Sequence, residues 1–155
     1  MGIRINDGLI GSARLGYQVL HPTSTVPAAQ AYNLYTIVTG NVLVTSLVGT
    51  ITVDIGAGAN AAQIGSNPTV GVIDYWDNGA VDLNGQLVGI MIAPTGDVAV
   101  VAEMGNSVLG EMVNPKVVKP GVISITMAAA TGGAGSISWV IHYIPLEVGA
   151  YIVTA

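Results

Sequence analysis

The fold is decided by the stretch Lys119–Leu146, KPGVISITMAAATGGAGSISWVIHYIPL. Residues 122–127 alternate strictly between two faces, and residues 136–144 alternate in the same way with many β-branched and aromatic side chains. Residues 128–135 between them are small and glycine-rich, and Pro145 has no N–H to continue a ladder. We therefore predict a β-hairpin. One face of its two strands is formed by Ile123, Ile125, Met127, Ile137, Trp139, Ile141 and Tyr143.

Short strands also fill the chain before this stretch. Residues 35–55 are apolar on both faces, as in a buried strand region, with a break at Gly40 and an expected bulge at Gly49. Turn signals every eight to twelve residues favour a sandwich, a jelly roll or a small barrel. We predict an all-β fold, an antiparallel, jelly-roll-like β-sandwich. Shorter strands are expected at 70–75, 87–92, 98–102, 117–118 and 150–153, with turns at 56–62 and 66–68.

The first 34 residues differ from the rest because their apolar residues keep neither strand nor helix period. Pro22 and Pro27 push the residues before them toward extended conformations. We expect an extended N-terminal arm over 1–34, lying across the domain or a neighbouring subunit, and a β-sandwich domain over 35–155. A poorly ordered tail is the alternative, although disordered tails carry fewer apolar residues. The expected interface residues of the arm are Ile3, Ile5, Leu9 and Ile10.

The composition is unusually poor in charge. Charged residues make up 8% of the 155, against about 25% in ordinary soluble domains, while hydrophobic residues reach 51%. Such a surface is poorly protected against association, which predicts contact with copies of itself or with a partner. The net charge of −5, with four basic residues and no basic cluster, argues against nucleic acid. Without cysteine the chain has no disulfide and no thiolate site.

The mean hydropathy of +0.65 raises the question of a membrane span. The two long uncharged stretches, 15–53 and 120–146, hold fewer than 18 consecutive apolar residues, because prolines, glycines and hydroxyl residues interrupt them. The first seven residues lack the apolar core of a signal peptide. We expect a soluble protein with no membrane partner and no conventional secretion signal.

The densest polar cluster is DYWDNG, residues 74–79, followed by Asp82. Asp74, Asp77 and Asp82 are candidate oxygen ligands for Ca²⁺, although the spacing is not that of an EF-hand. A turn in which these side chains bond their own backbone is the simpler interpretation. Tyr75 and Trp76 beside carboxylates also suggest a sugar-binding platform, but adjacent strand residues face opposite ways.

No pattern typical of catalysis is present. His21 and His142 are the two histidines, and neither lies in a nucleophile-elbow or other local motif. The glycine-rich stretches lack the Gly-Lys-Ser/Thr of a P-loop and the helix that a dinucleotide fingerprint requires. We therefore expect no enzyme, no catalytic residue, no cofactor and no metal site.

The C-terminal third resembles small virion proteins of tailed bacteriophages. The resemblance lies in Pro120-Gly121, the strand of residues 123–126, the AAATG of 128–132, the SWVIHYIPL of 138–146 and Gly149-Ala150, with a weaker similarity at 65–68. It covers about 40 residues and brings no family site residue with it. It implies a β-rich head decoration (cement) protein, often trimeric, whose partners are its own copies and the major capsid protein.

The same resemblance implies a place on the capsid surface of the virion, after synthesis in the host cytoplasm. A tail or baseplate component is the alternative within this class, and a carbohydrate-binding β-sandwich module is the alternative outside it.

Overall fold

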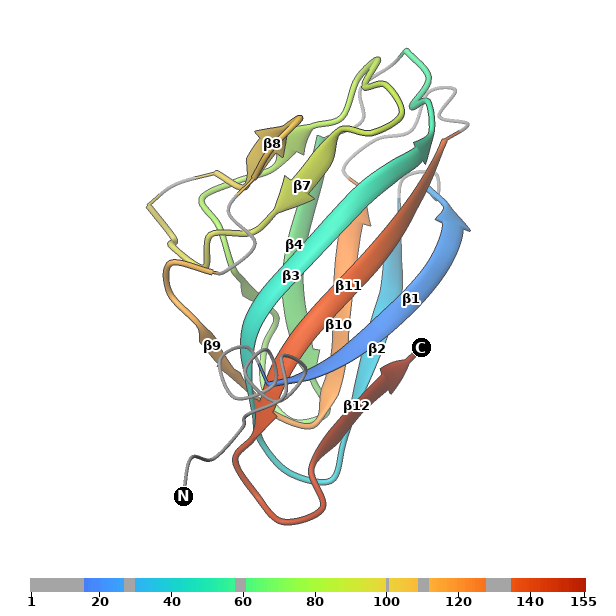
Figure 1. Cartoon of the computed structure of the whole chain (residues 1–155). Coiled ribbons are helices and arrows are strands. Elements are labelled where there is room, and N and C mark those ends of the chain that lie inside the picture. The colour runs from blue at the N-terminus through green and yellow to red at the C-terminus, as the bar shows by residue number, and fades with distance from the viewer. Residues whose placement is uncertain (1–15, 27–29, 58–60, 100, 109–111, 128–134) are drawn as a thin grey trace, which may run out of the picture.

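Two six-stranded antiparallel sheets pack face to face in the computed structural model (Figure 1), as predicted. The structure describes residues 16–26, 30–57, 61–99, 101–108, 112–127 and 135–155. The described residues form strands and no helix, so none of them provides an apolar helix long enough to cross a membrane. The strands are β1 (Tyr17–Thr25), β2 (Ala31–Val38), β3 (Val42–Val53), β4 (Ala61–Pro68), β5 (Asp74–Tyr75), β6 (Val81–Asp82), β7 (Met91–Ala93), β8 (Glu103–Gly105), β9 (Lys116–Val118), β10 (Gly121–Met127), β11 (Ser136–Pro145) and β12 (Tyr151–Thr154).

The chain passes repeatedly from one sheet to the other. The first sheet has the order β1-β11-β3-β7-β8, and β9 also pairs with β3. The second has the order β12-β2-β10-β4-β5, and β6 also pairs with β4. Strands that follow one another in sequence therefore often lie in opposite layers.

The hairpin predicted for the C-terminal third is wrong, although both of its strands exist. β10 pairs with β2 and β4, whereas β11 pairs with β1 and β3 in the other sheet. Ile123 and Ile125 of β10 and Ile137 and Trp139 of β11 are all buried. Alternation shows which face of a strand is buried but not which strand lies beside it. The same residues are buried whether the two strands pair in a hairpin or lie in opposite sheets of a sandwich.

Gly49 allows the largest side chain of β11 to pack against β3. A Cβ atom on Gly49 would lie 2.6 Å from the ring of Trp139, its direct cross-strand partner. The register on either side, Ser138 with Thr50 and Val140 with Val48, is continuous. The bulge expected at Gly49 is therefore absent, and the glycine instead makes room for the indole.

The described part of the expected arm belongs to the sandwich. β1 pairs with β11 from Tyr17 to Thr25, and the expected boundary between residues 34 and 35 falls inside β2. The irregular pattern that suggested an arm arises because β1 lies at the edge of its sheet, where few side chains are buried, and because its register shifts between His21 and Ser24. Residues 1–15 lie outside the described residues.

Several short elements also differ from the expectation. Residues 66–68 end strand β4 instead of forming a turn, because β10 pairs with them. The strand expected at 70–75 is shortened to β5. The strands expected at 87–92 and 98–102 begin later in the chain, as β7 and β8. Those expected at 117–118 and 150–153 are present as β9 and β12.

Candidate functional site

The three aspartates that suggested a metal site do not converge. Asp74 is exposed in β5, and Asp82 is exposed in β6, where its Oδ1 accepts from the backbone N–H of Asn84 at 2.9 Å. Asp77, which lies between these two in sequence, is buried. Among the residues that the structure describes, no three histidine, aspartate or glutamate side chains are grouped to hold a metal ion.

The sugar-binding platform is contradicted by the position of Trp76. Its side chain is 0% exposed, and its indole N–H points to Ser66 Oγ at 3.4 Å. A ring that stacks on a sugar must present a face to solvent, and Trp76 presents none. Tyr75 is partly exposed but has no aromatic partner beside it in this segment.

Asp77 fastens two loops together inside the molecule. Its Oδ1 accepts from the backbone N–H and the hydroxyl of Thr95, both at 2.8 Å, and from the N–H of Gly96 at 3.3 Å. Its Oδ2 is buried and has no hydrogen-bond partner among the described residues. Thr95 in turn accepts from Asp97 N–H through its hydroxyl and from Asn114 N–H through its carbonyl. Asp77 thus serves as the anchor of the loop at 95–97.

Burial raises the pKa of the Asp77 carboxyl, because removal from water disfavours the charged form. The hydrogen bonds from Thr95 and Gly96 and the positive charge of Lys116 act in the opposite direction. In this arrangement Asp77 acts as a buried hydrogen-bond acceptor that holds Thr95 and Gly96 in place.

The two histidines lie on opposite faces of the first sheet. His21 is buried in the core, where its ring meets those of Tyr32 and Tyr35 edge-on and its Nδ1 lies 2.8 Å from the Pro22 carbonyl. His142 is opposite Gln18, on the outer face. Burial lowers the pKa of His142, and its Nδ1 has no partner among the described residues. The histidines share no site.

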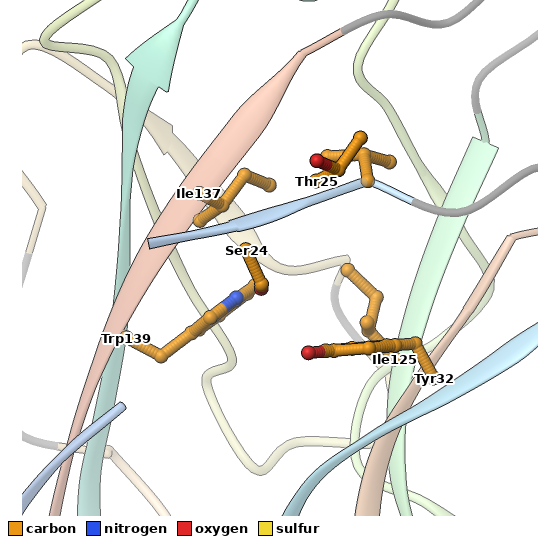
Figure 2. A pocket seen from close by; sticks show the side chains of 7 residues that line it. Ser24, Thr25, Tyr32, Ile125, Ile137 and Trp139 are labelled. Carbon is orange, nitrogen blue, oxygen red and sulfur yellow. The ribbon is translucent and has the colours of Figure 1, made fainter. Parts of the chain in front are cut away.

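A small cavity lies between the sheets where β1 ends (Figure 2). It measures about 10 Å³ and is lined from both layers, with Tyr32 and Ile125 on one side and Ile137 and Trp139 on the other. This volume holds at most about one water molecule. It is a packing gap and too small for a substrate.

A second hollow is an open groove of about 280 Å³ that we call the β9 groove. It runs between β9 of the first sheet and the chain that continues from β4 into β5 of the second. Aliphatic side chains dominate its walls, and a carboxylate and an ammonium group add one charge of each sign. Its lining residues are Ser66, Pro68, Val70, Gly71, Val72, Asp74, Val117, Val118 and Lys119.

The walls of the β9 groove are fixed by backbone contacts. The Pro120 carbonyl accepts from the N–H of Thr69 at 2.9 Å and from its hydroxyl at 3.2 Å. Gly121 has a φ of +151° and lies so close to the Asn67 carbonyl that a Cβ atom would collide with it. These contacts tie the 119–121 turn to the end of β4, so both walls of the groove are joined to the sandwich by backbone hydrogen bonds.

The rim of the β9 groove is apolar and open to solvent. Val70 is 82% exposed, Val72 is 83% exposed and Val117 is 61% exposed. Scattered exposed aliphatic residues are ordinary, but here three exposed valines converge on one hollow. The sequence signal is the apolar run Val70–Ile73, which the sequence pattern assigns to a short strand over 70–75. The expected interface residues Ile3, Ile5, Leu9 and Ile10 lie outside the described residues.

Comparison with known proteins adds no assignment. No family model, no curated protein and no solved structure matches the chain.

Proposed function

We propose that this chain is a structural protein of a bacteriophage virion, of the head decoration (cement) type, without enzymatic activity. It would bind the head shell as a homo-oligomer, with a trimer as the expected form. The observation that carries the proposal is the apolar rim of the β9 groove on a protein with only 8% charged residues. Such a surface is suited to lasting contacts with other chains.

The strand order supports the jelly-roll form of the sandwich. Eight strands form the centre of the two sheets: β1 to β5, β7, β10 and β11. If these eight are numbered 1 to 8 along the chain, one sheet has the order 1-8-3-6 (β1-β11-β3-β7) and the other has the order 2-7-4-5 (β2-β10-β4-β5). We infer the double Greek key of a jelly roll, which occurs in viral capsid proteins and also in lectins and cupins. A fold alone does not determine function, so this order is only a supporting argument.

The mechanism proposed is linkage between binding and assembly. A protein that binds the assembled shell more tightly than its separated subunits raises the free energy needed to break the shell. Pre-formed, rigid β-sheet surfaces suit this role, because little conformational entropy is lost when they bind.

The test is binding to emptied heads of the phage whose genome encodes the chain, prepared without this protein. The full-length protein is expected to sediment with the heads and to raise the temperature at which they break. Changing Ile3 and Ile5 to Asp is expected to reduce occupancy several-fold and to leave β1 intact, whereas Thr154→Asp, at an exposed end, is the control. Failure of the unaltered protein to bind heads contradicts the proposal, and binding to isolated tails instead would favour a tail or baseplate role.

A further inference from the structure

The chain enters the described structure at the same end of the sandwich as the β9 groove. Gly16, just before β1, packs against the backbone of Tyr143 in β11. Tyr143 pairs with Val44 of β3, and Val44 pairs with Lys116 of β9. Strands in a sheet are about 4.8 Å apart, so three steps place the start of β1 about 15 Å from β9. Figure 1 shows β1 beginning beside the end of the sandwich that carries β9.

The residues before Gly16 are long enough to reach a neighbouring molecule. Fifteen residues precede it, and an extended chain spans about 3.3 Å per residue, which gives about 50 Å. This is well beyond the distance to the groove of the same molecule. The segment can therefore cross an interface between two copies.

The chemistry of this segment fits the groove. Ile3 and Ile5 alternate around Arg4, so in an extended conformation both isoleucines face the same way. The groove offers aliphatic walls, and β9 pairs on one edge with β3 while its other edge pairs with no strand among the described residues. An extended segment can add to such an edge through its backbone while its alternate side chains fill the hollow.

The charges are complementary as well. Asp74 and Lys119 line the groove, and residues 3–10 carry Arg4 and Asp7, so each of the two surfaces has one charge of either sign. Half of the four basic residues of the chain lie in these fifteen residues. In a chain with so few charges, opposite charges on the two surfaces favour this pairing over contact with an uncharged partner.

We propose that the β9 groove binds residues 3–10 of a second copy of this chain, laid along the free edge of β9. This inference rests on the proposed self-association and specifies which parts of the two copies are in contact. Exchange of arms buries surface from both partners without enlarging either domain, and repeated around a ring it closes a symmetric oligomer.

The absence of cysteine allows a direct test with single cysteines in the full chain. Ile5→Cys protein is mixed with Val117→Cys protein of different tag mass and treated with a short bismaleimide. The matched control is Leu87→Cys, which is 63% exposed against 61% for Val117 and lies near the other end of β3. The two-chain product is expected to form several-fold faster with Val117→Cys than with Leu87→Cys.

Two results overturn the inference. One is an equal rate for Val117→Cys and Leu87→Cys. The other comes from a chain that carries both Ile5→Cys and Val117→Cys. If the cross-link forms only within this single chain, and still forms after strong dilution, the segment lies in the groove of its own molecule. Light scattering on the same samples separates the two proposals: an oligomer without the two-chain product overturns the arm contact alone, whereas a monomer overturns self-association.

Discussion

At Asp77, burial and hydrogen bonding act on the carboxyl in opposite directions. One carboxylate oxygen takes three donors from Thr95 and Gly96, while the other is buried without a partner among the described residues. The bonds stabilise the loop at 95–97, and the unpartnered oxygen disfavours the charged form. The two effects can be separated by substitution.

Asp77→Ala is expected to lower the free energy of unfolding by about 1–3 kcal/mol, because it leaves buried donors without an acceptor. Asp77→Asn keeps an acceptor at Oδ1 and removes the buried charge, so its loss is expected to be the smaller of the two. Urea unfolding at pH 7 measures both, with the exposed Asp82→Asn as control. Equal losses for Ala and Asn would show that the bonds to Thr95 and Gly96 contribute nothing.

The stability of the unaltered protein relative to Asp77→Asn is expected to depend on pH. Folding raises the pKa of Asp77, so the folded state holds its proton more tightly than the unfolded chain does. The contribution of this group is therefore fully present below the ordinary pKa of an aspartate and is lost as pH rises through the folded pKa. Urea midpoints of the two proteins across the acid range measure it, and a constant difference would contradict it.

Gly49→Ala is expected to destabilise the protein by about 1–3 kcal/mol, because its methyl group would overlap the Trp139 ring in a packed core. Gly105→Ala is the matched control: it also lies in a strand, and the atoms nearest to its Cβ are at 3.7 Å and 4.0 Å. Thermal unfolding of both variants measures the difference. Equal melting temperatures would mean that the indole does not lie over Gly49.

At this scale the sequence was a poor guide to the cluster at 74–82. It shows three carboxylates and two aromatic rings close together, which suggests a site. It does not show that Trp76 and Asp77 turn inward while Asp74 and Asp82 face solvent. That division depends on how β5 and β6 pair with β4, an earlier strand of the chain. The sequence of the cluster itself does not contain this pairing.

At the scale of elements, the strongly alternating strands were predictable and their partners were not. β10 and β11 follow the alternation closely because each buries one main face, and β3 follows the prediction of a strand that is apolar on both faces, since residues of both parities are buried in it. Pairing depends on contacts distant in sequence, which alternation does not encode. The eight residues between β10 and β11 exceed the usual two to five of a hairpin loop, and this was the available sign that the chain crosses to the other sheet.

A pair of engineered cysteines tests this crossing. Thr126 and Gln63 are direct partners in β10 and β4, a geometry that permits a disulfide. The variant with cysteine at both positions is expected to oxidise within the folded chain. Cysteines at Thr126 and Ser138, the partners that a hairpin would require, are expected to remain as thiols. Thiol titration after mild oxidation measures this, and the reverse pattern would restore the hairpin.

At the scale of the whole molecule, composition predicts a partner-covered surface but does not say where on the molecule it lies. A charge-poor chain predicts a partner-covered surface, and exposed valines do meet at the β9 groove. The location follows from the junction of the two sheets at β9 and the end of β4, which is a property of the tertiary structure. The proposed virion role requires that other chains cover this surface.

The most direct measurement is the mass of the purified protein in solution, by light scattering over a range of concentrations. Self-association through the β9 groove predicts a stable species heavier than the 15.7 kDa of one chain, with the trimer expected of the proposed decoration role, and changing Ile3 and Ile5 to Asp is expected to break it into single chains. A mass of 15.7 kDa at every concentration for the unaltered protein would contradict the account.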